Sequence, residues 1–389
     1  MKTKPSIWLM VTLIMFPQIV ETIYSPALPH IARGFDVSVA LASQTLSIYF
    51  SAFAVGVLVW GIVSDYLGRR KTMLLGLAVY GIAAIGAVFT TDFESLMVMR
   101  GLSAFGAAVG SVVTQTILRD SYDGESLSKV FTYMGIGISF SPVIGMMLGG
   151  VLAEYNGYQG VFVALSMLAL MLWSACLVRL PETKSTSSQK SSLIKLAKNM
   201  SQDIALWRST ALVACFNIML FSYYLQGPFI FENLELGSSE FGQSGIVLSL
   251  GTLLGSIASK KLLGKVHFGI QMDSNGLVLL ASVLSVCGAF GIWLLQDTLW
   301  FLAAIILVVM GFGIGMPNVL SHALVRYKDQ VGSAGALFGL MYYLIIGSGL
   351  GLVGLVQNLG GTLLLVSVIA LLLVSTLSFK KVGQIQAEA

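Results

Sequence analysis

The chain has 389 residues, of which 56% are apolar and only 10% are charged, and its formal net charge is +4. Soluble globular proteins carry about 25% charged residues, so this composition excludes a soluble protein of this length. A net charge this small gives no indication of nucleic-acid binding. The apolar residues gather in runs of about 20, the length of a helix that crosses a bilayer. Because lipid forces every backbone group to be paired within the segment, the runs predict an all-α integral membrane protein.

Twelve apolar runs follow one another along the chain, and we expect each to form one transmembrane helix. The first run follows Lys2 and Lys4, but it has no clean small-residue cleavage site and is interpreted as a helix rather than a signal peptide. The predicted spans are 8–28, 42–63, 72–90, 96–118, 130–153, 159–179, 209–231, 243–258, 275–295, 299–320, 331–356 and 361–379.

A polar segment rich in serine and lysine, 180–208, divides the twelve spans into two sets of six. We therefore predict two pseudo-symmetric six-helix bundles, an N-terminal one at 1–179 and a C-terminal one at 209–389. The segment between them is predicted to be a cytoplasmic linker with a short amphipathic helix near 193–206. Two facing bundles would place a substrate path between them, near the bilayer midplane.

The distribution of charge predicts the orientation in the membrane. If the N-terminus is cytoplasmic, 20 of the 22 lysines and arginines lie on the cytoplasmic side, and Arg33 and Arg100 are the exceptions. The acidic residues divide almost evenly, with nine inside, eight outside and Glu21 within the first span. Topology is set by an excess of basic residues on the cytoplasmic side, whereas acidic residues contribute little. Both ends of the chain are therefore predicted to be cytoplasmic.

The loop after the second span has a distinctive sequence, Gly61-Ile-Val-Ser-Asp65-Tyr-Leu-Gly68-Arg69-Arg70. Glycines suit a tight turn between closely packed helices, and the aspartate can pair with the arginines or cap a neighbouring helix. The spacing Gly-x-x-x-Asp-x-x-Gly-Arg-Arg, between the second and third spans, resembles the signature loop of the major facilitator superfamily. The resemblance extends over nearly the whole chain and implies a transporter with that superfamily's fold.

The fourth span also resembles the superfamily. It begins Arg100-Gly-Leu-Ser-Ala-Phe-Gly106, an arginine followed by small residues, and an acid, Asp120, follows its end. In the superfamily such an acid joins the charge network of the signature loop. The resemblance therefore implies that Asp120 pairs with Arg69, while Asp65 caps the eleventh transmembrane helix.

The fifth span carries Gly137-Ile-Ser-Phe-Ser141-Pro142-Val-Ile-Gly145. This stretch resembles the antiporter motif of the drug/proton antiporter family, which implies exchange of a substrate for protons. It departs from the motif at two positions, because Ser141 and Met146 stand where the family pattern has glycine.

Other stretches resemble the bicyclomycin/chloramphenicol-resistance branch of that family and, within it, the EmrD-like multidrug exporters. EmrD-type proteins have an uncharged glutamine where Glu21 stands, and bicyclomycin-type proteins have an aspartate, so this chain follows the acidic pattern. The stretches are Glu21-Thr-Ile-Tyr24-Ser-Pro26, Tyr223-Tyr224-Leu-Gln226-Gly-Pro228, Gly315-Met-Pro317-Asn318 and Gly332-Ser-Ala-Gly335.

Glu21 is the one carboxylate predicted within a span, about 20 Å along the first helix at a rise of about 1.5 Å per residue. An ionised carboxylate at that depth costs several kcal/mol unless it faces a partner or water, so its protonated form becomes accessible. We therefore predict that Glu21 binds protons and substrate in alternation. The alternative is a structural carboxylate near a helix end that frays towards Pro26.

Arg100 is the one cation predicted within a span, near its outer end. The resemblance implies a role in the cavity, either hydrogen bonding to the first helix or tuning the proton affinity of Glu21. Because a guanidinium keeps its proton in proteins, Arg100 would tune the electrostatics and would not carry protons. The alternative is a side chain that snorkels to the membrane interface.

Several aromatic and amide side chains also fall within spans. A buried tyrosine needs a partner for its hydroxyl or an aqueous cavity, so these residues are candidates to line a cavity for amphipathic molecules, although each alone could equally serve helix packing. They are Gln18, Tyr24, Tyr49, Gln115, Asn217, Tyr223, Tyr224, Gln226, Tyr342 and Tyr343.

The sequence contains no phosphate-binding loop, zinc-protease helix motif or nucleophile elbow, so neither an enzyme nor an ATP motor is predicted. The cysteines fall singly inside apolar runs and the histidines at loops or span ends, so we expect no disulfide, metal, cofactor or histidine role. The unpaired residues are Cys176, Cys215, Cys287, His30, His267 and His322.

The favoured function is a proton-coupled exporter of amphipathic or lipophilic small molecules, a monomer in the bacterial inner membrane that uses protons and the bilayer but no nucleic acid. A dedicated exporter of one metabolite or siderophore stays open, and so does an importer or facilitator of the same fold. A membrane-embedded enzyme or a receptor-like sensor is a third class, but catalysis would need convergent acidic, histidine or cysteine groups, and the spans offer Glu21 and Arg100 on different helices.

Overall fold

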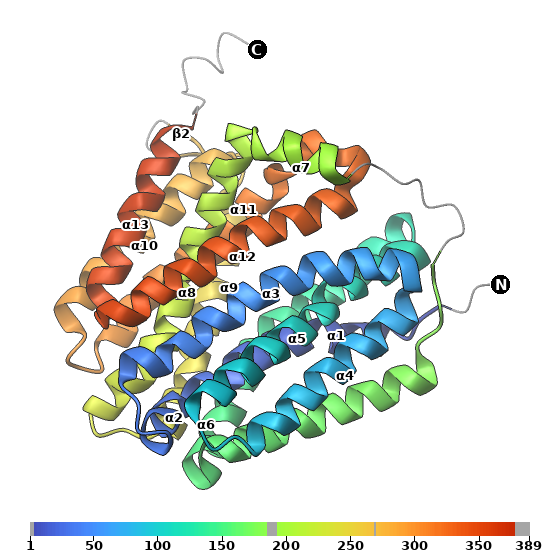
Figure 1. Cartoon of the computed structure of the whole chain (residues 1–389). Helices are drawn as coiled ribbons and strands as arrows, with labels where there is room; N and C mark the ends of the chain where they lie inside the picture. The colour runs from blue at the N-terminus through green and yellow to red at the C-terminus, as the bar shows by residue number, and fades with distance from the viewer. Residues whose placement is uncertain (1–3, 185–192, 268–269, 378–389) are drawn as a thin grey trace.

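The computed structural model describes residues 4–184, 193–267 and 270–377, and it is almost entirely helical (Figure 1). The first half of the chain contains α1 (Ile7–Ile23), the 3-10 turn η1 (Ser25–Ala27), α2 (Leu28–Gly34), α3 (Val39–Leu67), α4 (Arg69–Val88), α5 (Phe93–Ser121) and α6 (Gly124–Arg179). A short helix, α7 (Leu193–Ser201), follows in the linker. The second half contains α8 (Ile204–Asn233), α9 (Ser238–Leu262), α10 (Ser274–Leu295), α11 (Phe301–Ala323), the 3-10 segment η2 (Val325–Gln330), α12 (Val331–Val356) and α13 (Leu359–Ser375).

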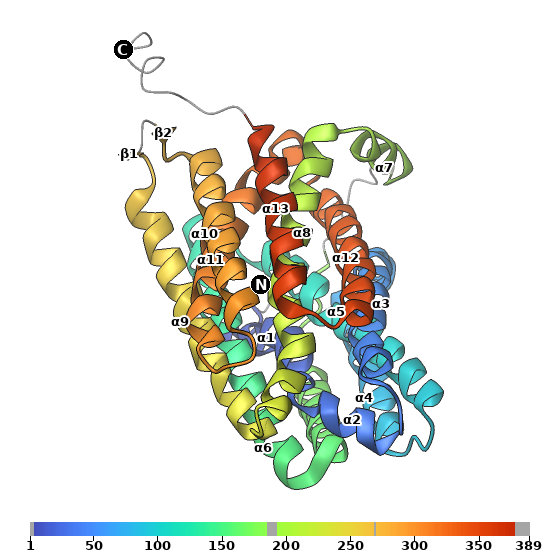
Figure 2. The ribbon, with the colours of Figure 1, turned by 90° about the vertical axis from the view of Figure 1, so that its left-hand side faces the viewer.

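In the part of the chain that the structure describes, each of the twelve predicted spans corresponds to helix, and positions 378–379 of the last predicted span lie outside that part. Within the described residues, ten helices are long and apolar enough to cross a membrane, with α1 and α2 counted together. One of these, α6, has 56 residues, but its backbone leaves the helical region at Gly157 (φ 61°, ψ −162°), where the chain reverses, so α6 supplies two spans (Figure 2). The twelfth, α13, has 17 residues, at the short end of the lengths of about 17–25 that can cross a bilayer.

The linker and one loop differ in detail from the prediction. The amphipathic helix α7 is shorter than predicted, and α8 begins at Ile204 rather than at 209 because the Asp203 carboxylate accepts hydrogen bonds from the first free backbone N–H groups, those of Ala205 and Leu206, at 3.0 and 3.2 Å. The linker residues 185–192 lie outside the described residues. Between α9 and α10 the chain forms a hairpin that was not predicted, β1 (Val266–His267) with β2 (Ile270–Gln271), in which Val266 pairs antiparallel with Gln271.

Successive spans run in opposite directions (Figures 1 and 2). The side on which α1, α4, α8, α10 and α12 begin also carries α7, and we call it the linker side; the opposite side is the far side. Both ends of the described chain lie on the linker side, as an even number of spans requires. Contacts between the halves are made mainly by α3 against α12 and by α6 against α9.

Hydrogen bonds join the two halves in the part of the helices nearer the far side. Ser47 Oγ donates to the carbonyl oxygen of Gly347 at 2.7 Å, and Gln44 Nε2 donates to that of Gly351 at 3.0 Å. The other polar pairs between halves among the described residues are Ser25–Tyr224, Pro26–Ser238, His30–Ser238, Arg33–Glu232, Ser43–Gln357 and Glu154–Ser238. All of these pairs among the described residues lie towards the far side, so hydrogen bonds and an ion pair seal the halves there.

Candidate functional site

Glu21 lies in the last turn of α1, where the helix breaks. The ring of Pro26 has no N–H group, so the α-helical ladder cannot continue past it, and the chain makes the turn η1 before α2 begins. The Glu21 side chain is only 2% exposed, and its Oε1 atom has no hydrogen-bond partner among the described residues. The predicted membrane-embedded carboxylate is therefore buried in the protein rather than lying against lipid.

Arg100 extends from α5 into the same region. It is 1% exposed, and its guanidinium carbon lies 3.7 Å from the centroid of the Tyr24 ring and 4.7 Å from that of Tyr49. No ion pair within 4.0 Å joins Arg100 to Glu21 in the described part of the chain, although its charge acts on the carboxylate. The cation is held by aromatic faces, which does not fit the snorkelling alternative.

The surroundings of Glu21 and Arg100 contain several polar groups without partners. The Nε and Nη2 atoms of Arg100 and the hydroxyls of Tyr49 and Tyr80 make no hydrogen bond within the described structure. A buried polar group left unpaired costs about 1–3 kcal/mol, so a cluster of them calls for an explanation in terms of function, water or a ligand. The cluster offers one carboxylate, one guanidinium and hydroxyls that a proton, water or substrate could engage.

An aromatic group that we call the aromatic seam lies where α3, α8 and α12 meet between the two halves. The ring centroids of Phe50 and Phe221 are 4.4 Å apart, and those of Phe53 and Tyr343 are 4.9 Å apart. Tyr224 packs on Phe221 at 5.5 Å. The tyrosines were predicted from their hydroxyls, whereas the three phenylalanines were missed because, in an apolar run, phenylalanine has no feature that separates it from ordinary core.

The other predicted cavity residues do not form a single site. Tyr223 packs inside the second half against Phe241 and Phe301, and its hydroxyl bonds Ser244 at 2.5 Å. Gln226 is 3% exposed and lines a separate cavity of about 480 Å³ near the far side. Tyr342 packs against Tyr343 of the aromatic seam with the two rings tilted by 45°. Gln18, Gln115 and Asn217 are half-buried elsewhere along the helices.

The signature loop forms a charge network at the linker side. Arg69 is almost buried, and its guanidinium donates to Asp65 at 2.6 Å and to Asp120 at 2.8 Å. The predicted pair between Asp120 and Arg69 is thus present. The described residues show no hydrogen bond from Asp65 to the eleventh transmembrane helix. Asp65 accepts from Arg69 instead, and it lines a cavity of about 190 Å³ together with Gly332 in the first turn of α12.

Glu182 in the linker is a further member of the charge network, and it was not predicted. Its carboxylate accepts hydrogen bonds from the backbone N–H groups of Arg69 and Arg70 at 2.8 and 3.2 Å, and so caps the start of α4. Gly68 has φ 92°, and a Cβ there would collide with this carboxylate, which explains the glycine. Arg70 completes the junction by donating to the carbonyl of Leu177 at 2.6 Å. The feature of the sequence that could have pointed to Glu182 is its position as an acidic residue three places after the end of the sixth predicted span.

Substitution of Glu182 by glutamine is expected to lower the melting temperature at pH 7, since loss of such a cap costs about 1 kcal/mol. Burial alone would raise the pKa of Glu182, but its backbone hydrogen bonds outweigh burial and lower the pKa below the usual 4.5. The carboxylate therefore stabilises the folded state above that pH, and the contribution is lost as the pH falls through the lowered pKa. The difference in melting temperature between variant and wild type should thus shrink on acidification.

The matched control for this prediction is Glu125→Gln. Glu125 is 84% exposed and pairs with Lys129, which is 70% exposed, so its loss should change little at any pH. Equal effects of the two substitutions at pH 7 would show that Glu182 does not stabilise the junction.

The antiporter-like stretch of α6 packs against α1 beside Glu21. A Cβ on Gly137 would lie 3.0 Å from Val11 and Met15, and a Cβ on Gly145 would overlap Thr22, the neighbour of Glu21. Ser141 is fully buried, and its hydroxyl donates to the carbonyl of Gly137 at 2.8 Å, one turn before Pro142. A serine is therefore tolerated where the family pattern has glycine, because its hydroxyl is satisfied within its own helix.

Three features together define a polytopic transporter of the secondary-transporter class rather than an enzyme. They are the twelve spans, the buried acid at the break in the first span, and the charged signature loop at the linker side. The model of the Major Facilitator Superfamily matches residues 10–361. The chain belongs to the Major Facilitator Superfamily.

Comparison with individual proteins agrees with this assignment. The chain is 32% identical over 354 residues to an uncharacterized transporter of Rickettsia felis, with 87% of this chain and 86% of that protein covered. It is 26% identical over 336 residues to a chloramphenicol resistance protein of Pseudomonas aeruginosa, with 84% and 78% covered. The crystal structure of a bacterial homolog of the human lysosomal transporter Spinster, inward-facing and occupied, shares the fold, with a TM-score of 0.71, 15% identity and 95% of each chain covered.

Proposed function

We propose that this transporter is a proton-coupled antiporter that exports amphipathic drugs or other small molecules by alternating access. The observation that carries the proposal is Glu21, a carboxylate that is 2% exposed in the first span, near the surface where the two halves meet. Such a group is costly to ionise inside a membrane protein and is by default a functional site. In one facing of the site Glu21 would take up a proton, and in the other it would release the proton as substrate binds.

The surroundings of Glu21 suit amphipathic substrates. The aromatic seam packs the buried rings of Phe50 and Phe53 against Tyr343 between the halves. Separation of the halves would free these rings to bind varied molecules by stacking and dispersion. The similarity to a chloramphenicol resistance protein supports efflux of such compounds. Each proton that crosses 100 mV inward releases about 2.3 kcal/mol, enough for an outward substrate gradient of about 50-fold if coupling is complete.

The orientation follows from the charge distribution. With both ends and the basic loops in the cytoplasm of a bacterium, the linker side is cytoplasmic and the far side is periplasmic. The seal between the halves then closes the periplasmic side, and substrate would enter from the cytoplasm, as an exporter requires. The two halves, 1–179 and 209–389 with the start of the second at Ile204, would move as units about this seal.

The proposal is tested with purified protein in liposomes that contain a pH-sensitive dye under an imposed proton gradient. A panel of quaternary ammonium compounds, dyes, uncouplers and phenicols is added to the wild type and to Glu21→Gln. Proton flux that depends on substrate and vanishes in the variant is the expected result. Substrate movement without proton flux in either protein would contradict antiport and favour a facilitator, and a response to a single compound class would favour a dedicated exporter.

A disulfide across the seal is expected to stop transport. A Cβ on Gly351 would lie 3.7 Å from the Cβ of Ser47, within the separation of about 3.5–4.5 Å that a disulfide needs. The pair Ser47→Cys/Gly351→Cys, in a background where the exposed Cys287 is serine, should lose transport on oxidation and regain it with a reductant. Either single-cysteine variant, oxidised in the same way, is the control. Undiminished transport by the cross-linked protein would show that this seal does not open.

A further inference from the structure

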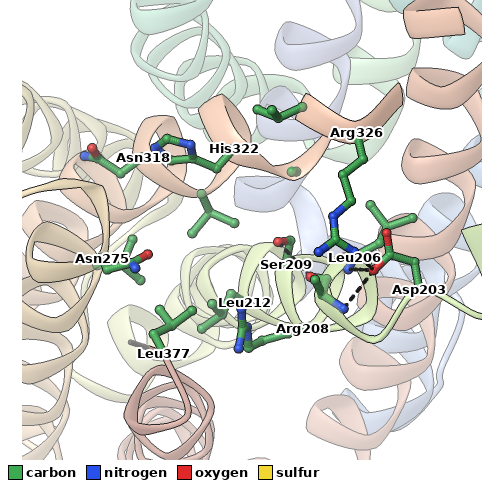
Figure 3. Close-up of a pocket in the computed structure, with 15 residues that line it drawn as sticks. Asp203, Leu206, Arg208, Ser209, Leu212, Asn275, Asn318, His322, Arg326 and Leu377 are labelled. Carbon is green, nitrogen blue, oxygen red and sulfur yellow. Dashed lines mark hydrogen bonds and ion pairs between the residues drawn. The ribbon is translucent and has the colours of Figure 1, made fainter. Parts of the chain in front are cut away.

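The second half contains a polar cavity at the linker side, away from Glu21 and the aromatic seam. Its volume is about 220 Å³. Figure 3 shows side chains that converge on it from the ends of α8, α10, α11 and α13 and from η2. The polar lining residues other than Asp203 are Arg208, Ser209, Asn275, Asn318, His322 and Arg326. His322, for which the sequence predicted no role, is among them.

Arg208 gives the cavity a cation that has no carboxylate partner in the described part of the chain. It is half-buried, and its hydrogen bond runs from Nη1 to the backbone carbonyl of Thr376 at 3.3 Å. No acidic oxygen of the described residues lies within 4.0 Å of its guanidinium. A guanidinium has five N–H donors and no acceptor, so Arg208 has donors left for an anion.

The acidic residue at the cavity, Asp203, is already engaged. Its carboxylate accepts hydrogen bonds from the start of α8 and from the Tyr327 hydroxyl at 3.1 Å, and it pairs with Arg326 at 3.3 Å. The Arg326 side chain is 72% exposed, so it remains accessible to a second anion. Among the lining residues that the structure describes, two arginines therefore face one carboxylate that is already engaged.

The cavity also has an apolar lining. The residues that supply it are Leu206, Leu212, Val278, Val319 and Leu377. The combination suits a ligand with an anionic head and an apolar part. Basic pockets between transmembrane helices on the cytoplasmic side are binding sites for anionic lipid head groups, and an arginine fork matches the oxygens of a phosphate in a bidentate manner.

We propose that this cavity binds a phosphate group through Arg208 and Arg326. The Ser209 hydroxyl and the Asn318 amide already donate within the protein, to Ala205, Ser259 and Ile314, so the two arginines supply the donors. The phosphate belongs either to the head group of an anionic phospholipid or to a soluble phosphate compound. Such a ligand would tie the start of α8 to the segment that leads into α12, because Arg326 lies in η2 and Arg208 in α8. The site is separate from the transport path and does not depend on the direction or coupling of transport.

The test measures binding to the full chain in detergent with two probes. Native mass spectrometry follows phosphatidylglycerol, with zwitterionic phosphatidylcholine for comparison, and equilibrium dialysis follows inorganic phosphate. The variants are Arg208→Gln and Arg326→Gln, and the matched control is Arg179→Gln, an exposed arginine at the linker-side end of α6. One probe should bind the wild type, Arg208→Gln should bind it about tenfold more weakly, equivalent to about 1.4 kcal/mol, and the control should bind as the wild type does.

The outcomes separate the sources and decide the proposal. Selective retention of phosphatidylglycerol identifies a lipid site, and saturable binding of inorganic phosphate identifies a soluble ligand. Binding of neither probe, equal binding by wild type and both variants, or an equal loss in Arg179→Gln would overturn the proposal. If Arg208→Gln does not fold, Arg326→Gln carries the test, because its exposed side chain can be removed without disturbing the core, and unchanged binding by that variant would overturn the proposal.

Discussion

The double substitution Glu21→Gln/Arg100→Met is expected to raise the melting temperature of the protein while abolishing coupled transport. Both side chains are at most 2% exposed, and no ion pair within 4.0 Å joins them in the described chain. Replacing such buried charges by neutral groups of similar size is often stabilising, by about 1–4 kcal/mol. The measurements are thermal unfolding in detergent and proton flux in liposomes.

The two single substitutions serve as the controls in a double-mutant cycle. Arg100→Met leaves Glu21 without the one cation that acts on it, and Glu21→Gln leaves the guanidinium alone, so each should be less stable than the double variant. A double variant that melts at a lower temperature than both single variants would mean that the two charges stabilise the fold. The presence of Glu21 and Arg100 would then be explained by stability and not by transport.

Substitution of Gly149 by alanine is expected to lower the melting temperature of the protein, and by more than substitution of Gly135 on the same helix. A Cβ on Gly149 would overlap the backbone carbonyl oxygen of Ile23 in α1, and a backbone atom cannot turn aside as a side chain can. Overpacking of this kind costs about 1–3 kcal/mol or more. Because Ile23 ends α1 two residues after Glu21, substrate-dependent proton flux should fall as well. Expression level, melting temperature and flux are the measurements.

The control for Gly149→Ala lies on the same helix. A Cβ on Gly135 would meet nothing within 4 Å among the described residues, so Gly135→Ala should be neutral or stabilising by up to about 1 kcal/mol, the difference in helix propensity. If Gly149→Ala were as stable as Gly135→Ala, the close approach of α6 to α1 would not be a constraint on the fold.

The helices were predictable from the sequence because a bilayer fixes their length. The five-residue gap between the predicted spans 130–153 and 159–179 contains Gly157, where α6 reverses. The same argument could not foresee the extension of the first span through α2 to Gly34 or the hairpin at Val266, because local turn geometry, and not bilayer thickness, decides those features.

The candidate site was predictable only in part. Charged residues stand out in an apolar run, so Glu21 and Arg100 could be named beforehand, and the resemblance to the superfamily implied the pair of Arg69 with Asp120. The packing partners could not be, since Phe50 has the same composition signal as any core residue until α8 and α12 are placed against it. Capping by Asp65 is not seen among the described residues, and the position of one helix start relative to another is a tertiary property that a loop motif does not determine.

The seal between α3 and α12 depends on backbone acceptors in α12. The hydroxyl of Ser47 and the amide of Gln44 bond carbonyl oxygens of glycines spaced four residues apart on α12, Gly347 and Gly351. Glycines at these places let the two helices approach, because a Cβ on Gly347 would overlap the Ser51 hydroxyl and a Cβ on Gly351 would lie 3.0 Å from the Ser47 hydroxyl. A shift of one helix along the other by one turn, about 5.4 Å, would bring Tyr343 or Leu355 to a place that now holds a glycine. The glycines therefore fix the register of α3 against α12, so the seal would open by separation of the two helices and not by sliding.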